Sequence, residues 1–196
     1  YTDGCLVKKD SIIAEIWGSP KTILSLERTL LNFLQHLSAI STTTSKVVEE
    51  LKDSNTKLLD TRKTTPGMRV LEKYATKKGG AKNHRINLSD KILIKDNHIK
   101  VCGNEEKLIN ILKTKNISNY QIECDSFFQV KKFYEFGCKS FLLDNMKVSE
   151  IKKSVSLKSK KENLIFEVSG GINLQNIKKY KDLGADFISS GFITQN

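Results

Sequence analysis

The sequence lacks the features that mark several large classes of protein. No apolar run approaches the roughly 18 to 20 residues that a membrane-spanning helix needs, so we expect no membrane partner. The four cysteines stand far apart and form no C-x-x-C pair (Cys5, Cys102, Cys124 and Cys138). This spacing argues against a disulfide framework or a zinc site. No basic and then apolar leader opens the chain at Tyr1, and reduced thiols fit a cytoplasmic protein.

Acidic residues are scarce relative to basic ones, because 22 Asp and Glu stand against 33 Lys and Arg, a net charge of +11. This excess is compatible with a nucleic-acid partner, with anionic substrates, or with no specific role, since much of it lies in lysine runs such as 152–163. A nucleic-acid-binding surface combines basic residues with exposed aromatics. Here five aromatics lie in one predicted helix, where packing explains several of them (Phe127, Phe128, Phe133, Tyr134 and Phe136). We therefore expect no nucleic-acid partner.

A long helix is predicted to begin at Pro20, with Ser19 as its cap. Its apolar residues recur every three or four positions and form one stripe (Ile23, Leu26, Leu30, Phe33, Leu37 and Ile40). Arg28 lies roughly 200° around the helix from Leu26 and is off this stripe, which by default makes it a solvated residue. His36, beside the stripe, is expected to serve packing or capping. Ahead of the helix, the runs at 5–9 and 12–17 resemble strands.

From residue 44 onward, short apolar runs alternate with amphipathic helical stretches. Strands are expected at 57–60, 91–95, 120–124, 140–144, 164–168 and 186–190, and helices at 68–78, 104–115, 126–137, about 148–155 and 174–184. This alternation predicts parallel strands with right-handed crossovers, as in a barrel or an open doubly wound sheet. No G-x-G-x-x-G follows the first strand, which favours the barrel.

The predicted fold class is α/β: an incomplete β/α barrel of the TIM type at 44–196, preceded by part of a small α+β sandwich domain and its linking helix at 1–43. The ends of the chain suggest a piece of a longer protein, because Tyr1 is no usual start and the sequence stops just past the last predicted strand. The expected helix ends include Asn104 as a cap, a capping box of Ser126 and Gln129, Thr65 as a cap with Pro66 at the first helical position, and Gly137 and Gly184 as stops.

Unusual residues recur at the ends of the predicted strands. The groups at or near these ends are Asp60 to Lys63, Lys95 to His98, Glu123, Asp144 with Asn145, Ser169 to Gly171, and Ser190 with Gly191. In a β/α barrel the carboxyl ends of the strands converge on one mouth, which carries the active site. The sequence therefore predicts a catalytic mouth lined by charged groups and glycine-rich turns.

These groups can be sorted by charge. The cations suit carboxylates and phosphates (Arg62, Lys63, His84, Arg85 and Lys95). Glu123 and Asp144 suit Mg²⁺, sugar hydroxyls or a developing positive charge. The turn at 169–171, before a helix expected from Asn173, suits a phosphate, with Gly191 beside it.

Each group also has a plain structural explanation. The turn at 169–171 could be no more than a tight turn, Glu123 could pair with a core lysine, and His98 is expected to bond to the backbone. Together the groups indicate a phosphorylated sugar, a metal and an acidic co-substrate.

Several segments resemble quinolinate phosphoribosyltransferases, in the same order and over nearly the whole chain. The segments are ERTLLNFLQHLSAIST (27–42), DTRKTTPGMRVLEKYATKKGG (60–80), NHR (83–85), LIKDNHI (93–99), IEC (122–124), LLDNM (142–146), EVSGGI (167–172) and ISSG (188–191). The run TRKTTPG is the most specific of them. The resemblance implies that quinolinate and phosphoribosyl pyrophosphate react, with Mg²⁺ present, to give nicotinate mononucleotide, pyrophosphate and carbon dioxide in NAD biosynthesis.

The resemblance also implies roles for individual residues. The quinolinate carboxylates would be held by Arg62, His84, Arg85 and Lys95, with Arg28 supplied by the neighbouring subunit of a homodimer or larger oligomer. Lys63 would meet phosphoribosyl pyrophosphate. Glu123 and Asp144 would hold ribose hydroxyls or Mg²⁺ and stabilise an oxocarbenium-like centre. The 5′-phosphate would lie against Ser169, Gly170, Gly171 and Gly191.

Some positions depart from the family pattern, and other functions stay open. Ala81 and Lys82 stand where glycine is usual, and Ser190 and Phe192 also differ, which puts the activity of this piece in question. One alternative is a relative in the same superfamily that uses another base, such as the enzyme associated with molybdenum transport. Another is a catalytically silent relative kept for assembly. The full set of four cations favours quinolinate, because a monocarboxylate would not require so many.

Overall fold

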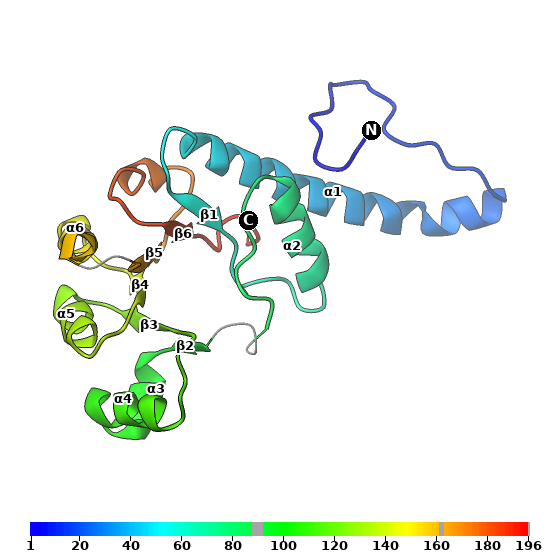
Figure 1. The fold of residues 1–196 in the computed structure, drawn as a ribbon. Helices are drawn as coiled ribbons and strands as arrows, with labels where there is room; N and C mark the ends of the chain where they lie inside the picture. The colour runs from blue at the N-terminus through cyan, green and yellow to red at the C-terminus, as the bar shows by residue number, and fades with distance from the viewer. Residues whose placement is uncertain (88–91, 161–162, 196) are drawn as a thin grey trace.

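The computed structural model describes residues 1–87, 92–160 and 163–195 (Figure 1). In chain order the elements are α1 (Pro20–Glu50), β1 (Lys57–Leu59), α2 (Arg69–Lys78), β2 (Ile92–Ile94), α3 (Asp96–Cys102), α4 (Glu105–Thr114), β3 (Tyr120–Cys124), α5 (Phe127–Glu135), β4 (Ser140–Asp144), α6 (Val148–Val155), η1 (Ser156–Lys160), β5 (Ile165–Ser169), η2 (Ile177–Lys179) and β6 (Phe187–Ser189), where η marks a short 3-10 helix. All six expected strands form, although Lys91, the first residue of the second one, lies outside the described residues.

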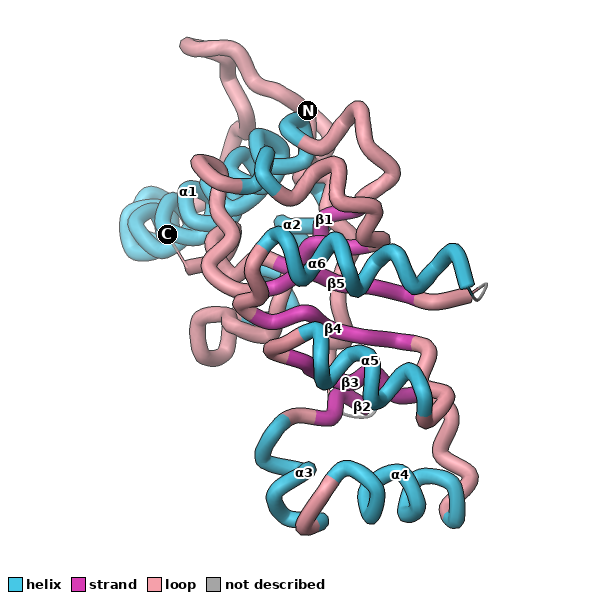
Figure 2. Tube along the Cα trace, turned by 90° about the vertical axis from the view of Figure 1, so that its left-hand side faces the viewer, coloured by secondary structure: helices cyan, strands magenta, loops and turns pink. Residues whose placement is uncertain are grey.

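The six strands build one parallel sheet in the order β1-β6-β5-β4-β3-β2. The sheet curves, and helices α4, α5 and α6 cover its outer face (Figures 1 and 2). β1 and β2 follow each other in the sequence but are the two edge strands, so the curved sheet is open between them. The segment after α2 runs beside β1 on that open side, where Lys82 forms a bridge with Leu59. The predicted α/β fold with an incomplete barrel of parallel strands is confirmed.

Alternation along the strands separates a packed face from a polar face. Side chains on the outer face are almost fully buried against the helices (Ile122, Cys124, Phe141, Leu143, Phe166, Val168 and Ile188). The residues between them face the hollow of the sheet, and many are polar (Gln121, Glu123, Asp144, Glu167, Ser169 and Ser189). Because strand side chains alternate with a period of two, burial of one set turns the other set inward.

Three of the expected helix ends are confirmed. Ser19 accepts a hydrogen bond from the backbone N–H of Thr22 at 3.3 Å, with Pro20 as the first helical residue. Asn104 caps α4 by accepting from the N–H of Lys107 at 2.9 Å. Gly137, at φ +89°, ends α5 in a conformation that side-chain-bearing residues avoid.

Two predicted caps are wrong. Thr65 does not open α2, because Pro66 and Gly67 instead form a turn, closed by the N–H of Met68 donating to the Thr65 carbonyl at 3.0 Å. Gly67 lies at φ +77°, which suits the third position of such a turn and delays the helix to Arg69.

The predicted capping box of α5 does not form either. Ser126 makes no side-chain cap bond, and Gln129 accepts from the N–H of Asp125 at 3.0 Å, one residue before the cap.

Other element predictions also need correction. The runs at 5–9 and 12–17 form no strand, because no sheet edge in the described part of the chain lies beside them, and they stay exposed. The helix expected at 174–184 shrinks to η2, so Gly184, at φ +79°, follows a loop rather than a helix. Helix α3 was not expected, and α1 continues without a break from Pro20 through residues 43 and 44 to Glu50.

The amino-terminal half of α1 extends beyond the sheet and its covering helices (Figure 1). Its apolar stripe is buried only near the other end, where Ile40 is 4% exposed. Leu26, Leu30 and Phe33 are between 42% and 50% exposed, so most of the predicted stripe is not buried within one copy of the chain. Across the described residues, α1 and the other helices are too short or too polar to span a bilayer.

Candidate functional site

The parallel order of the strands brings their carboxyl ends to one edge of the sheet, which is where the predicted site residues lie. Three contacts tie neighbouring strand ends together at this edge. They join β2 to β3, β4 to β5, and β1 to β6. The residues predicted at the strand ends, other than Asp60, are thus distributed along one curved edge rather than over different surfaces.

The contact between β2 and β3 is an ion pair of Lys95 with Glu123. Lys95 Nζ lies 2.9 Å from Glu123 Oε2, one residue beyond the last register pair of the two strands. The Lys95 side chain is 46% exposed and that of Glu123 is 20% exposed. The expectation that Glu123 pairs with a lysine is therefore met, but by a lysine at the mouth and not in the core.

The contact between β4 and β5 joins Asp144 and Asn145 to the glycine turn. Asp144 is in register with Ser169 and accepts a hydrogen bond from Asn145 Nδ2 at 2.9 Å. Asn145 approaches Gly170 so closely that a Cβ at Gly170 would collide with Asn145 Oδ1 and lie 2.7 Å from the Asn145 backbone nitrogen. Gly170 and Gly171 have φ of +107° and +58°, so both positions favour glycine.

The contact between β1 and β6 places Lys63 against Gly191. A Cβ at Gly191 would lie 3.3 Å from Lys63 Cδ, and Thr194 Oγ1 donates to the Lys63 carbonyl at 2.8 Å. Arg62, next to Lys63, is half-buried, and its Nε is one of two buried side-chain atoms in the described residues that have no hydrogen-bond partner. An unpaired buried guanidinium N–H is suited to an anion that binds there.

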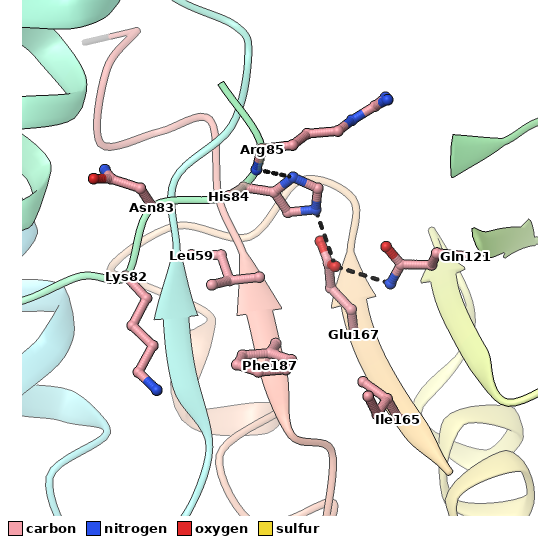
Figure 3. A pocket seen from close by; sticks show the side chains of 9 residues that line it. All are labelled: Leu59, Lys82, Asn83, His84, Arg85, Gln121, Ile165, Glu167 and Phe187. Carbon is pink, nitrogen blue, oxygen red and sulfur yellow. Dashed lines mark hydrogen bonds and ion pairs between the residues drawn. The ribbon is translucent and has the colours of Figure 1, made fainter. Parts of the chain in front are cut away.

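His84 and Arg85 lie on the segment that follows α2, beside a cavity of about 330 Å³ on the inner face of the sheet (Figure 3). His84 Nε2 is 3.2 Å from Oε2 of Glu167, which comes from β5, and His84 Nδ1 accepts from the backbone N–H of Arg85 at 2.8 Å. Gln121 of β3 donates to the same Glu167 oxygen at 3.0 Å. Both ring nitrogens of His84 are therefore engaged within the chain.

The Glu167 carboxylate is only 2% exposed. Burial alone would raise the pKa of Glu167, but the hydrogen bond and charge of His84, followed by the side chains of Ser189 and Gln121, outweigh burial and hold this pKa below its usual value. Glu167 is therefore an anion at neutral pH, inside the hollow of the sheet and below a mouth rich in cations.

Asp60, which ends the first predicted strand, points away from this mouth. It is fully buried and accepts from Lys73 Nζ, from Thr76 Oγ1 at 3.0 Å, from Asn83 Nδ2 at 2.6 Å and from the backbone N–H of His84 at 2.7 Å. The carboxylate thus fixes the segment of His84 and Arg85 against α2. The interpretation of Asp60 as a mouth residue is wrong, because the alternation that turns Leu59 inward turns Asp60 outward.

The predicted phosphate turn lacks a helix behind it. No α-helix starts at Asn173, and the N–H groups of Gln175 and Asn176 both donate to Asn173 Oδ1, at 3.0 and 3.2 Å. The turn at 169–171 therefore offers glycine backbone at the edge of the sheet but no helix dipole. This corrects the expectation of free N–H groups at a helix start.

Arg28 is not brought to the other site residues. It is exposed on the projecting half of α1, and among the described residues no hydrogen bond or ion pair involves its side chain. His98 follows its expectation, since its Nδ1 accepts from the backbone N–H of Lys95 at 2.9 Å. Of the two roles expected for His36, capping is wrong and packing fits: it bonds Glu72 Oε1 at 2.9 Å, where α1 packs against α2.

The donor set for a metal is small. Within the described residues, no group of three or more His, Cys, Asp or Glu side chains lies close enough to hold an ion. Glu123 and Asp144 remain as carboxylates at the edge of the sheet. Such a pair fits Mg²⁺ that keeps several waters and arrives with substrate phosphates, which is how Mg²⁺ is commonly bound.

Two inward residues of this site, Glu167 and Gln121, were not singled out from the sequence. Each is a polar side chain inside an otherwise apolar strand, in IFEVS and YQIEC. Glu123 was singled out by this same feature, which could therefore also have identified Glu167 and Gln121. Glu72, fully buried in α2, carries a similar but weaker signal, because a glutamate in an amphipathic helix is usually solvated.

Cations and carboxylates thus share one edge of the sheet, with glycine turns between them. Guanidinium and ammonium groups bind carboxylates and phosphates. Carboxylates suit sugar hydroxyls, a hydrated Mg²⁺ or positive charge that develops at a reacting carbon. The edge is therefore chemically suited to a polyanionic sugar phosphate and an acidic partner molecule.

Comparison with protein families matches the whole chain. The model described as quinolinate phosphoribosyl transferase, C-terminal domain, matches residues 40–196, and the model of the N-terminal domain matches residues 1–38. The chain is 38% identical to a probable nicotinate-nucleotide pyrophosphorylase (carboxylating) of Bacillus subtilis, over 99% of this chain and 67% of that protein. It is 36% identical to the protein of the same name from Archaeoglobus fulgidus, over 99% of this chain and 77% of that protein.

Solved structures give the same result. NadC from Streptococcus pyogenes superposes with a TM-score of 0.89 at 38% identity, over 100% of this chain and 68% of that one. The nicotinate-nucleotide pyrophosphorylase of Ehrlichia chaffeensis gives a TM-score of 0.82 at 43% identity, over 88% of this chain and 63% of that one. The chain spans about two thirds of the length of most of these relatives. It belongs to the quinolinate phosphoribosyl transferase family.

Proposed function

We propose that this chain transfers the phosphoribosyl group of phosphoribosyl pyrophosphate to quinolinate, with loss of carbon dioxide, to give nicotinate mononucleotide and pyrophosphate in NAD biosynthesis. The relatives' name, a carboxylating pyrophosphorylase, describes the same chemistry in the reverse direction. One observation carries the proposal: cations and carboxylates lie along a single edge of the sheet, with Lys95 and Glu123 in direct contact. The free cysteines and the biosynthetic reaction favour a cytoplasmic location.

The cations recognise quinolinate in this proposal. Arg62, Arg85 and Lys95 neutralise its two carboxylates, and the unpaired Nε of Arg62 provides a donor that a carboxylate oxygen would satisfy. His84 offers a carboxylate only its Nε2 proton, because Nδ1 already accepts from Arg85. A carboxylate that bonds to His84 therefore shares that proton with Glu167.

The remaining residues handle phosphoribosyl pyrophosphate. Lys63, which lies against Gly191, meets its phosphates, and the turn at 169–171 with Gly191 lets the 5′-phosphate approach the backbone. Glu123 and Asp144 bind the ribose hydroxyls. As pyrophosphate departs, their negative charge stabilises the positive charge that develops at the ribose carbon.

Mg²⁺ would be held by Glu123 and Asp144 through oxygen atoms or water, together with the phosphates of the substrate. When bound, the ion supplies positive charge that stabilises the departing pyrophosphate. The small set of protein ligands fits an ion delivered with the substrate and not one permanently held by the protein.

The proposed activity is tested by mixing the protein with quinolinate labelled in its 2-carboxylate, phosphoribosyl pyrophosphate and Mg²⁺. We expect carbon dioxide and pyrophosphate to appear in equal amounts, and only when all three components are present. No carbon dioxide from quinolinate, together with turnover of another pyridine or heterocyclic acid, contradicts the substrate assignment. That outcome would favour a relative that uses a different base.

We also propose that two copies of the chain pair through the projecting half of α1. Leu26, Leu30 and Phe33 form an apolar stripe there that nothing in the described part of this chain covers. A two-fold dimer would bury the stripe against its own copy. Arg28 lies off the stripe on the same part of the helix, from which it can enter the site of the partner.

Mixed dimers test this arrangement directly. Arg28→Ala and Glu123→Gln each inactivate a different half of the proposed site, so either variant alone has little activity. Hybrids of the two variants regain one native site per dimer, and random mixing restores about a quarter of wild-type activity. No recovery in hybrids, or a monomeric wild-type protein in sedimentation, contradicts the shared site.

A further inference from the structure

A buried carboxylate inside the hollow of the sheet has no role in the proposed reaction so far. Glu167 is 2% exposed, and its Oε1 has no hydrogen-bond partner. Among the described residues, the only other buried side-chain atom in this condition is Arg62 Nε, which belongs to the proposed quinolinate site. Buried polar atoms are usually paired, so each exception calls for an explanation.

The other oxygen of Glu167 is fully engaged. Oε2 receives His84 Nε2 at 3.2 Å from one side and Gln121 Nε2 at 3.0 Å from the other (Figure 3). The contacts therefore join β5, β3 and the segment after α2, which are far apart in the sequence. This segment lies on the open side of the curved sheet, and Glu167 contacts it from β5 across the hollow of the sheet.

The hydrogen bonds fix the state of the His84 ring. Nδ1 accepts from the backbone N–H of Arg85 at 2.8 Å, so in the neutral ring the proton sits on Nε2 and points to Glu167. The same contact sets the backbone direction of Arg85. In Figure 3 the Arg85 side chain extends away from Glu167, past the arrowheads of the neighbouring strands.

We propose that Glu167 is a positioning residue for substrate recognition: it orients the His84 ring, and through that ring it holds Arg85 at the mouth. This inference rests on the proposed function, in which Arg85 and His84 meet the carboxylates of quinolinate. Glu167 itself touches no substrate. Glu167 lines the cavity, and its unpaired Oε1 is available to a water.

A purely structural role explains Glu167 less well. Asp60 shows how this chain builds a structural carboxylate, with the Lys73 ammonium and three further donors on its two oxygens. Glu167 has no lysine or arginine partner in the described residues and leaves one oxygen unpaired. A structural role alone gives no reason for the unpaired oxygen, because a carboxylate that only holds the fold is expected to use both of its oxygens, as Asp60 does.

The first test compares two substitutions of the same residue. Glu167→Met removes both acceptor oxygens, while Glu167→Gln keeps one oxygen that can still accept from His84. We expect Glu167→Met to raise the KM for quinolinate by about tenfold, the effect of losing one charged hydrogen bond. Glu167→Gln should recover part of that loss, and the KM for phosphoribosyl pyrophosphate should stay unchanged in both.

Glu105→Gln is the matched control, because Glu105 pairs with Lys132 on the helix side of the sheet, 3.2 Å away. It removes the same charge away from the site and should leave both KM values unchanged. A Glu167→Met variant in which kcat and both KM values worsen together shows general damage and overturns the positioning role. So does a Glu167→Gln variant no better than Glu167→Met.

A double-mutant cycle tests whether Glu167 acts through His84. If it does, Glu167→Met adds nothing to the KM for quinolinate once His84→Asn is present. Losses that multiply in the double variant show that the two residues act independently, and overturn the proposal.

Nitrogen-15 spectra of histidine-labelled protein give a readout that needs no activity. Wild-type His84 should show a protonated Nε2 and an unprotonated Nδ1, and Glu167→Met should shift only the His84 signals. His98, whose Nδ1 accepts from Lys95, is the internal reference. Unchanged His84 signals in the variant overturn the proposal. A wild-type protein that turns over no quinolinate defeats the proposed function instead, and the spectra still show whether Glu167 orients His84.

Discussion

Buried charged groups are paired differently on the two faces of the curved sheet. Behind β1, on the outer face, Asp60 is fully buried and each of its oxygens has partners, among them the ammonium group of Lys73. On the inner face, Glu167 leaves one oxygen unpaired, and beyond the end of β1 Arg62 leaves Nε unpaired. Both carboxylates bond His84, one at its backbone N–H and the other at its ring.

The difference separates groups that hold the fold from groups that serve the site, either by binding the substrate or by positioning the residues that bind it. A carboxylate with every acceptor site filled has little left to offer a substrate, and removing it leaves its partners unpaired in the interior. Loss of a side chain that leaves an atom unpaired should affect substrate binding or turnover more than stability, because fewer contacts of the fold depend on it. Five substitutions, in four experiments, test this contrast.

The largest effect is expected on the outer face, for Asp60→Asn. The substitution leaves the Lys73 ammonium, which is 3% exposed, without a counter-charge. Breaking a buried ion pair on one side destabilises a protein by about 3 to 5 kcal/mol. Urea denaturation followed by circular dichroism measures the free energy of unfolding. The control is Glu105→Gln, which removes one partner of a part-exposed ion pair and is expected to lose about 1 kcal/mol or less. If Asp60→Asn loses no more stability than Glu105→Gln, the proposed difference between the two faces is wrong.

The next largest effect is expected on the inner face, for Glu123→Gln and Asp144→Asn. Each should lower kcat by on the order of 10² while the fold is retained, because a positioned charge near the developing positive centre is lost. Steady-state kinetics and a urea curve on the same preparations separate the two effects. Wild-type turnover in either variant removes that residue from the mechanism.

A smaller effect is expected for Arg62→Lys. Lysine keeps the charge but not the fork of N–H donors that a carboxylate accepts, so the KM for quinolinate should rise by about tenfold with stability unchanged. Titration of quinolinate by calorimetry, in parallel with kinetics, measures the change. If the wild type and Arg62→Lys bind quinolinate with equal affinity, Arg62 contributes only its charge.

The smallest effect is expected for Glu167→Gln, in the dependence of stability on pH. Because the pKa of Glu167 is lowered in the folded protein, the stability that its ionised form contributes is present above the ordinary value of 4.5 and is lost as pH falls through the lowered value. The nearest titratable group is His84, at 3.2 Å. In Glu167→Gln this contribution is absent, so melting temperatures between neutral pH and pH 3 should fall less steeply than in the wild type. Identical acid slopes contradict the assignment of the lowered pKa.

The strand pattern was predictable from the sequence because the outer-face residues carry it. Each strand alternates or runs apolar over three to five residues, as in Phe141 to Leu143, and the helices between them show a clear period. The strand-end rule then located Lys95, Glu123 and Asp144 on one edge. Local patterns were enough wherever burial on one face decides the structure.

The errors come from contacts that the sequence does not display. Asp60 and Glu123 are both acidic residues near strand ends, but the side of the strand they face depends on register, and only Glu123 faces the mouth. Glu72 is buried because His36 of α1 and the N–H of Thr65 meet it, at 2.9 and 3.3 Å. Pairings between distant segments of this kind have no local signature.

Crystals of the protein soaked with quinolinate would locate the acid groups of the substrate directly. Both carboxylates should lie within hydrogen-bond distance of Arg62, Arg85 or Lys95, with one oxygen on the Arg62 Nε that is now unpaired. Quinolinate bound on another surface, with these three side chains out of contact, would show that the inner face does not recognise the diacid.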